Sequence, residues 1–281
     1  MSERWLVKPG QTIHLEALDT NSTDGAPGDR DTTDAQLPAL HQELGALQDR
    51  LWAENRRALL VVLQAMDAGG KDGTIRHVFD AVNPQGTRVT SFKQPTPLEL
   101  RHDFLWRVHQ AVPAAGEIGI FNRSHYEDVL VVRVHGLVPQ HLWSKRYDQI
   151  NSFEELLHQG STTVVKLFLH ISNDEQKRRL EERLHQPEKR WKFSASDAAE
   201  RAFWNDYRIA YEEALHSSEV VAIDMRDVRI CLREPNDDLM YVTNATALAT
   251  LLDRKAKGAE FGALQEGERF ERMPSFEITL R

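Results

Sequence analysis

The sequence predicts an α/β fold in which helices cover both faces of a parallel β-sheet. Short apolar runs of strand length alternate with segments of helical periodicity, a pattern typical of parallel strands connected through helices. The segments richest in polar side chains follow directly after these runs, at the strand ends where such folds bind their ligands. We expect five strands, at residues 58–64, 87–92, 117–121, 163–169 and 219–223.

The region before the first strand divides into an arm and a helix. Residues 1–35 are expected to form an irregular N-terminal arm, because the stretch from Asn21 to Asp29 is rich in turn formers. The segment from about Asp34 to Asn55 predicts a long helix. Leucines recur there every three or four positions, the spacing of one helical face, at Leu37, Leu40, Leu44, Leu47 and Leu51.

Length and composition fit a globular protein. A chain of 281 residues with 41% hydrophobic residues can bury a full core. It has no apolar run of about 18 residues and no signal-peptide pattern, so we expect a cytoplasmic protein that does not enter a membrane. The single cysteine, Cys231, excludes an internal disulfide. We expect a main domain at residues 36–260 and a C-terminal tail at residues 261–281.

The segment after the first strand predicts a phosphate-binding loop. It combines the end of a buried strand, a turn of small residues, one lysine and the start of a helix. Backbone N–H groups in such a turn converge on an anion, the helix adds the positive end of its dipole, and the lysine adds a mobile charge. We therefore expect phosphate contacts from Ala68, Gly69, Gly70, Lys71, Asp72, Gly73 and Thr74.

This loop matches the common phosphate-loop pattern incompletely. Ala65 stands at the first glycine of G-x-x-x-x-G-K-[ST], and Asp72 stands where a metal-binding hydroxyl is expected. The alternative is a polar strand-to-helix turn, in which Asp72 caps the helix and Lys71 is a solvated surface charge. The rest of the chain favours phosphate binding.

A second polar segment, residues 122–128, follows the third strand. In phosphate-loop enzymes the end of a neighbouring strand usually supplies an acid that holds Mg²⁺ or its water, and here that position is Asn122. A neutral amide brings less charge, so Asp67, Glu127 or Asp128 must supply more of the carboxylate chemistry. For Glu127 and Asp128 the alternative is acid placement at a helix N-terminus.

Arg123 in this segment could fork two oxygens of a phosphoryl group, which a lysine cannot do. A structural salt bridge is the alternative explanation for this arginine. His125 and Tyr126 are expected to pack or to form hydrogen bonds, because phosphoryl transfer depends chiefly on positioning and charge stabilisation.

The charge of the chain is unevenly distributed. The net charge of −8 argues against a general nucleic-acid binder, yet residues 176–192 hold seven basic side chains and three acidic ones. Such a segment beside a phosphate loop would concentrate a polyanion there, although a solvated helix face is the alternative. Trp191 within it would either anchor the segment or stack on a purine.

In this order, the motifs resemble the family-2 polyphosphate kinases. The resemblance runs from about Leu37 to Leu215, and each string alone is a weak to moderate signal. It rests on LQAMDAGGKDGTIRHV, NPQG, SFKQPT, HDFLWRVH, IGIFNRSHYEDVLVVRVHGL, LFLHISNDEQKRRLEERL and PEKRWKFSASD. It implies a P-loop kinase fold that is thymidylate-kinase-like, with a five-stranded parallel sheet between helices and a helical lid at about residues 175–205.

The resemblance also implies Mg²⁺-dependent, reversible transfer of a terminal phosphoryl group between inorganic polyphosphate and a nucleotide, with Mn²⁺ as a possible substitute. It assigns Asp67 to the metal and the acceptor phosphate, and Lys71 to the transferring phosphates. Asn122 and Arg123 occupy the second loop of the site. Further basic residues match positions that line the phosphate path in such enzymes, namely Lys93, Arg133, Arg178 and Arg183.

The string FNRSHYEDVL resembles the subclass that accepts both nucleoside mono- and diphosphates, because Glu127 replaces the asparagine of other forms. Glu127 therefore joins the expected catalytic residues. AMP and ADP are the expected acceptors, ATP and ADP the products, and a homodimer or homotetramer the expected assembly.

The match weakens beyond Ser218. The apolar run before Asp224 keeps the last strand and its aspartate, whereas a rival register places the equivalent aspartate at Asp238. We prefer the first register because the apolar run directly precedes the aspartate. From about Leu239 to Lys257 the sequence has helical character.

Two other functions compete with this interpretation. An ATP-dependent nucleotide or small-metabolite kinase could be built on the same fold, since fold alone does not decide function. A non-catalytic phosphate or nucleotide sensor is the second alternative, which the combination of Asp67, Lys71 and Arg123 disfavours.

Overall fold

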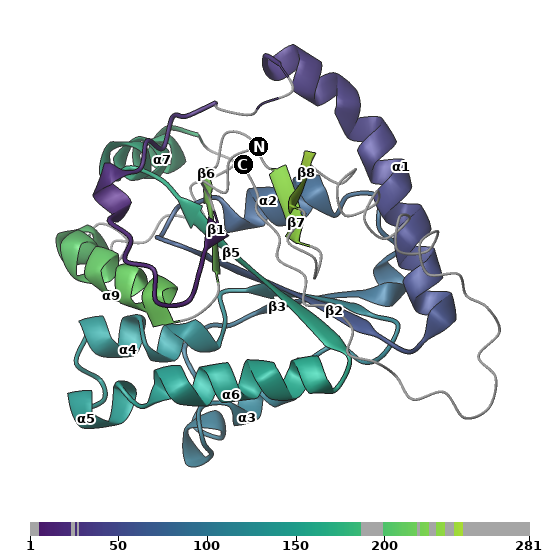
Figure 1. The fold of residues 1–281 in the computed structure, drawn as a ribbon. Helices are drawn as coiled ribbons and strands as arrows, with labels where there is room; N and C mark the ends of the chain where they lie inside the picture. Colours follow the sequence, from purple (N-terminus) through teal and green to yellow (C-terminus); the bar gives the residue numbers. More distant parts are fainter. Residues whose placement is uncertain are drawn as a thin grey trace.

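The computed structural model describes residues 6–23, 26, 28–186, 199–217, 220–224, 229–233 and 239–243. At its centre is a six-stranded sheet in the order β1-β6-β5-β2-β4-β3 (Figure 1). Five of these strands run parallel and confirm the predicted ones: β2 (Ala58–Ala65), β3 (Thr87–Ser91), β4 (Ile118–Asn122), β5 (Thr162–His170) and β6 (Val220–Asp224).

The sixth strand comes from the arm that was predicted to be irregular. β1 (Leu6–Val7) pairs antiparallel with β6, so the expected five-stranded sheet gains one antiparallel edge strand. Both β1 side chains are buried. Two residues are too few for periodicity to reveal a strand, which is why the sequence did not predict it.

The first long helix, α1 (Arg30–Glu54), begins before the predicted start at Asp34 and takes in the last residues assigned to the arm. The Asp29 side chain accepts a hydrogen bond from the Thr32 backbone N–H at 2.9 Å and caps the helix. Asn55, in the left-handed conformation with φ 49°, ends it. The leucine face is confirmed, since Leu40 and Leu44 pack into the core of the sheet.

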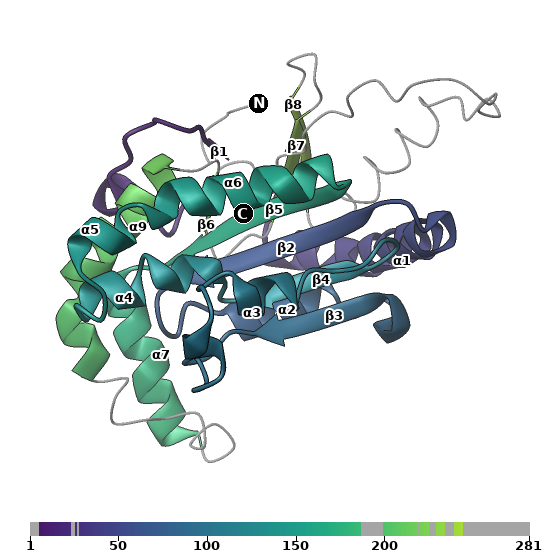
Figure 2. The same ribbon diagram turned by 90° about the horizontal axis from the view of Figure 1, so that it is seen from below.

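The pleat of β2 divides the core into two layers. Leu59, Val61 and Leu63 face α1 and α2 (Lys71–Val78) on one side of the sheet. Leu60 and Val62 lie in the second apolar cluster, together with side chains from two helices on the other side, α6 (Arg146–Gln159) and α9 (Trp204–Ser217). Figure 2 shows α6 and α1 on opposite sides of the sheet. The predicted helix–sheet–helix layering is confirmed.

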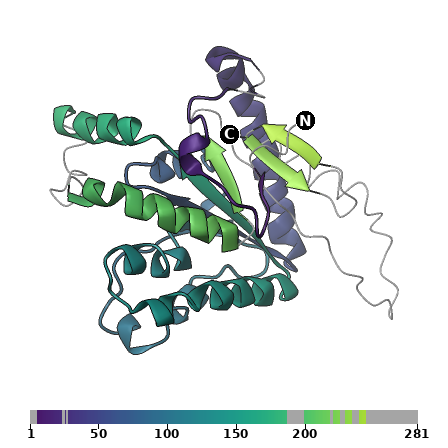
Figure 3. The ribbon, with the colours of Figure 1, turned by 60° about the vertical axis from the view of Figure 1, so that its left-hand side comes forward.

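The shorter helices connect these layers. They are α3 (Trp106–His109), α4 (Val131–Val134) and α5 (Gln140–Trp143). The first half of the predicted lid is α7 (Asn173–His185), and Figure 3 shows it beside α9 at one end of the molecule. Residues 187–198, which include Trp191 and the middle of the predicted lid, lie outside the described residues, as does the predicted tail at 261–281.

The C-terminal part agrees with the sequence prediction in its first strand and differs from it after that. β6 ends at Asp224 inside the central sheet, in agreement with the preferred register. Residues 239–243, expected to be helical, instead form β8 (Leu239–Thr243), which pairs antiparallel with β7 (Arg229–Arg233). This five-residue run is almost entirely apolar, and an apolar run this short cannot be told from part of a helix by periodicity alone.

Candidate active site

The loop between β2 and α2 has no room for a larger side chain at Gly69. A Cβ atom on Gly69 would lie 2.4 Å from the Ala65 Cβ and 2.7 Å from the Met66 carbonyl oxygen. Ala68 and Gly70 both have positive φ, at 58° and 97°. The Gly69 N–H donates to the Met66 carbonyl at 2.9 Å and closes the turn. The backbone therefore makes a tight turn directly into the N-terminus of α2, the geometry expected of an anion-binding loop.

Lys71 is buried in this loop and is not a solvated surface charge. Its side chain folds back so that Nζ donates to the Ala65 carbonyl oxygen at 3.2 Å. Tyr211 from α9 donates to the same carbonyl oxygen at 2.9 Å. Burial, reinforced by the nearby charge of Arg123, lowers the pKa of Lys71 to about 8. The ammonium group is thus held inside the loop.

The end of β4 brings the second polar segment beside the loop. β4 runs parallel to β2 with Asn122 opposite Leu63, so the residues that follow both strands meet at one edge of the sheet. Arg123 has φ 62°, and its N–H donates to the Leu63 carbonyl at 3.0 Å. Asn122 reaches α2, where its Nδ2 donates to Asp72 Oδ1 at 2.7 Å.

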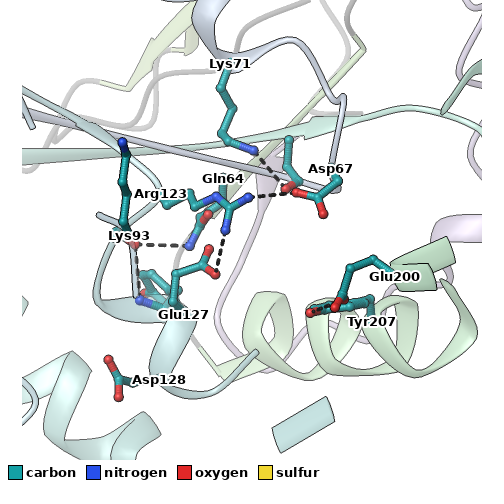
Figure 4. Close-up of polar contacts among 12 residues, drawn as sticks. Gln64, Asp67, Lys71, Lys93, Arg123, Glu127, Asp128, Glu200 and Tyr207 are labelled. Carbon is teal, nitrogen blue, oxygen red and sulfur yellow. Dashed lines mark hydrogen bonds and ion pairs between the residues drawn. The ribbon is translucent and has the colours of Figure 1, made fainter. Parts of the chain in front are cut away.

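Arg123 joins the two loops through its guanidinium group. One nitrogen bonds Asp67 Oδ1 at 2.8 Å, and another lies 3.8 Å from Glu127 Oε2 (Figure 4). Burial raises the pKa of Glu127, while Arg123 and Lys71 act in the opposite direction. The structure thus gathers the five residues predicted as catalytic: Asp67, Lys71, Asn122, Arg123 and Glu127. The salt bridge that was the alternative explanation for Arg123 is therefore present, but its partners, Asp67 and Glu127, are themselves predicted catalytic residues.

The oxygen donors of this site suit Mg²⁺, which needs only a few ligands from the protein. The site offers carboxylate and amide oxygens, and a third of the Asp67 side chain is exposed. Among the described residues, no three His, Cys, Asp or Glu side chains gather closely enough to hold a metal ion. Mg²⁺ typically binds through one or two carboxylates and takes its remaining ligands from substrate phosphates and water.

Asp128 lies away from this cluster. Its Oδ1 accepts a hydrogen bond from Arg146 at 2.8 Å, and Arg107 lies 3.9 Å from its other oxygen. Figure 4 shows its carboxylate separated from those of Asp67 and Glu127. Of the two acids considered beside Asp67, Glu127 therefore lies in the site, whereas Asp128 pairs with Arg146 and Arg107 outside it.

The four residues predicted to line the phosphate path come from several elements and not from the two loops described above. Lys93 is exposed after β3, and its carbonyl accepts from Arg107 at 2.8 Å. Arg133 pairs with Glu213 at 2.5 Å and lies over the Trp143 ring, 4.6 Å from its centroid. Arg178 is bonded to Glu175 and Glu182 of its own helix, and Arg183 lies in the last turn of α7.

A buried ionic cluster beneath the second loop escaped the sequence prediction. Glu154 of α6 accepts from Lys166 at 2.5 Å, from Tyr126 at 3.0 Å and from His125 Nε2 at 3.0 Å. Burial alone would raise the pKa of Glu154, but Lys166 and His125 lower it to about 2. The cluster anchors the loop that carries Arg123. Its sequence signal was a lysine inside the apolar run of β5.

The comparisons with known proteins bear on this geometry. Residues 28–223 match the model of the family described as Polyphosphate kinase 2. The chain belongs to this family. A crystal structure of Polyphosphate Kinase 2 from Arthrobacter aurescens TC1 superposes with a TM-score of 0.78 and 38% sequence identity, over 95% of this chain and 93% of that one. The resemblance seen in the motifs and the P-loop kinase type of fold are both confirmed.

Two relatives of this polyphosphate kinase 2 family member are named for their substrates. The AMP/ADP-polyphosphate phosphotransferase of Meiothermus ruber is 53% identical over 216 residues, which cover 77% of this chain and 81% of that protein. The ADP-polyphosphate phosphotransferase of Rhodopseudomonas palustris is 50% identical over 186 residues, covering 62% and 64%. In the part of the chain that the structure describes, none of the helices is long and apolar enough to cross a membrane.

Proposed function

We propose that the protein transfers the terminal phosphoryl group of inorganic polyphosphate to a nucleotide, with ADP and AMP as acceptors. The observation that carries this proposal is the meeting of Asp67, Lys71, Arg123 and Glu127 at the ends of β2 and β4, in a chain of the polyphosphate kinase 2 family. The names of the Meiothermus and Rhodopseudomonas relatives favour polyphosphate over ATP as the donor.

In the forward direction, an oxygen of the acceptor's terminal phosphate attacks the last phosphorus of the chain. A P–O bond to the acceptor forms, the bond to the next phosphate breaks, and the polymer leaves one unit shorter. Little covalent help is needed from the protein, because such transfer depends on positioning and on stabilising charge. Arg123 and Lys71 supply positive charge at the two loops that face the transferring group.

Lys71 is held ready for this role by the Ala65 carbonyl. When a phosphate enters the loop, Nζ exchanges this 3.2 Å hydrogen bond for a charged phosphate oxygen. Tyr211 continues to donate to the same carbonyl at 2.9 Å, so the exchange leaves no buried acceptor without a partner. The pKa of Lys71, about 8 in this arrangement, would rise on phosphate binding.

Magnesium is the cofactor we propose, with Mn²⁺ as a substitute and with Asp67 as its principal protein ligand beside Asn122 and Glu127. When bound, the ion neutralises charge on the phosphates. Glu127 lies close to Arg123 and is largely buried, with 15% of its side chain exposed. In this proposal Glu127 supplies a second carboxylate beside Asp67, which would hold an additional ion when a short acceptor such as AMP approaches the donor.

A donor-exchange assay tests the proposal. The enzyme is supplied with Mg²⁺, polyphosphate and either AMP or ADP, without ATP, and the products are separated by chromatography. Formation of ADP from AMP and of ATP from ADP is expected. Absence of both products, together with phosphorylation of AMP when ATP is the donor, would support the ordinary nucleotide kinase instead. Binding of polyphosphate without any product would identify a sensor.

A further inference from the structure

The helix that begins the lid holds two consecutive carbonyl groups of the phosphate loop. Gln176 Nε2 donates to the Asp67 carbonyl oxygen at 2.9 Å, and Arg179 donates to the Ala68 carbonyl oxygen at 3.1 Å. The two side chains are one turn apart on α7, so they share one face of that helix. Gln176 is only 4% exposed, which removes competition from water.

The other end of the Gln176 amide is also occupied. Its Oε1 accepts a hydrogen bond from Arg201 at 3.0 Å. Arg201 also bonds the carbonyl oxygen of Asn173 at 3.1 Å and its Oδ1 at 2.7 Å. Residues on both sides of the 187–198 segment, one on α7 and one just before α9, therefore meet at a single buried amide.

From these contacts we infer that Gln176 and Arg201 form a relay that couples the lid to the metal-binding carboxylate of Asp67. The inference rests on the proposed function. A planar amide that donates at one end and accepts at the other transmits a displacement of Arg201 to the peptide of Asp67. That peptide sets the direction of the Asp67 side chain, which already contacts Arg123 at 2.8 Å. Gln176 is a positioning residue, because it acts only through Asp67.

The relay explains why this position needs an amide. A carboxylate at position 176 would still accept from Arg201 but would face the Asp67 carbonyl oxygen without a proton to donate. An aliphatic side chain would break both contacts and leave the Asp67 carbonyl without this donor. Outer contacts of this type around metal ligands typically change metal affinity or activity about 10- to 100-fold when they are removed.

The test compares Gln176→Leu, Gln176→Glu and Arg201→Lys with the wild type. For each variant we expect kcat to be about 10-fold lower than in the wild type, and the Mg²⁺ concentration for half-maximal rate to be at least about 5-fold higher. The KM for polyphosphate should stay within about 2-fold of the wild-type value. The double variant Gln176→Leu/Arg201→Lys should be no worse than Gln176→Leu alone, because Gln176→Leu already breaks the contact with Arg201. Gln159→Leu is the matched control, since Gln159 is exposed on α6 and bonds only Glu155 among the contacts described.

Mn²⁺ binding in the presence of ADP, followed by electron paramagnetic resonance, gives a readout that does not depend on turnover. The dissociation constant is expected to rise at least about 5-fold in Gln176→Glu, whose melting temperature should match the wild type. A lower melting temperature with unchanged Mg²⁺ and Mn²⁺ dependence would overturn the relay. It would also be overturned if the losses of kcat from the two single substitutions multiplied in the double variant. If Gln176→Leu fails to fold, Arg201→Lys decides. A wild type that binds Mn²⁺ but transfers nothing from polyphosphate contradicts the proposed function, while the relay is still read from Mn²⁺ binding.

Discussion

At the scale of single residues, we expect the protonation of Lys71 to control how well the loop binds phosphate. Its pKa of about 8 means that the ammonium form is lost as the pH rises through that value. We predict that kcat/KM for polyphosphate is maintained below about pH 8 and declines above it. Lys71→Arg, whose guanidinium stays charged, should remove this decline. A wild-type profile that stays flat up to about pH 9.5 would contradict the role of Lys71.

Asp67 carries the metal chemistry in this account, and its charge can be removed with little change of shape. We predict that Asp67→Asn lowers kcat by at least about 100-fold, as expected when a preorganised electrostatic contact is lost. The exposed Asp148 on α6 gives the matched control, since Asp148→Asn should change kcat by less than about 2-fold. Steady-state rates at saturating Mg²⁺ measure both, and a near-normal rate for Asp67→Asn would remove this residue from the mechanism.

Gly69 and Gly73 give a matched pair for the steric argument. A Cβ on Gly69 meets the Ala65 Cβ at 2.4 Å, whereas nothing lies within 4 Å of a Cβ on Gly73 in α2. Gly69→Ala should lower the free energy of unfolding by about 1–3 kcal/mol through overpacking. Gly73→Ala should raise it by up to about 1 kcal/mol through helix propensity. Urea unfolding measures both changes, and equal effects of the two substitutions would show that the turn can relax.

The contacts of single residues mark the limit of prediction from sequence. The loop at residues 65–74 was predictable because its chemistry is contiguous along the chain. The partner of Gln176 is Asp67, 109 positions away, and nothing in the local pattern indicates that contact. The ion pair of Arg133 with Glu213, 80 positions away, was likewise not indicated by the local pattern, and the place of Arg133 on the phosphate path stays a prediction.

At the scale of secondary-structure elements, the buried cluster of Glu154 and Lys166 joins α6 to β5 and supports the second loop. Replacing Glu154 by glutamine leaves the buried Lys166 ammonium without its counter-ion. We predict a loss of about 3–5 kcal/mol in the free energy of unfolding at neutral pH. The exposed Glu155 is the control, with Glu155→Gln expected to change stability by less than about 0.5 kcal/mol.

The same cluster has a defined pH dependence. The pKa of Glu154 is about 2 in the folded protein and 4.5 as the ordinary value. A depressed carboxylate pKa stabilises the fold above the ordinary value, and this stability is lost as the pH falls from about 4.5 towards 2. The difference between wild type and Glu154→Gln should therefore shrink over that range. A difference that is the same at both ends would show that the contact is not ionic.

Element by element, four of the five parallel strands were predictable because each is an apolar run bounded by polar turns, whereas β3 is mostly polar. β1 was missed because two residues carry no period, and β8 was mistaken for helix because five residues fit both patterns. The start of α1 was misplaced because the polar cap at Asp29 lies before the first leucine of the helical face.

At the scale of the whole molecule, the order of parallel strands explains why the site forms where it does. β4 and β2 are neighbours in the sheet but are separated in the chain by β3, so the two polar loops meet only through the fold. The motif order and the family resemblance predicted this meeting, whereas periodicity alone could not supply the strand order. The homodimer or homotetramer and the cytoplasmic location stay predictions.

The central claim is that the loop at residues 65–74 grips the donor's phosphate chain beside Asp67 and Arg123. Crystals soaked with short-chain polyphosphate and Mg²⁺ test it most directly. The account predicts density for consecutive phosphates against the backbone of this loop, with Lys71 Nζ moved from the Ala65 carbonyl to a phosphate oxygen. Phosphate density elsewhere on the molecule, with Lys71 still bonded to Ala65, would contradict it.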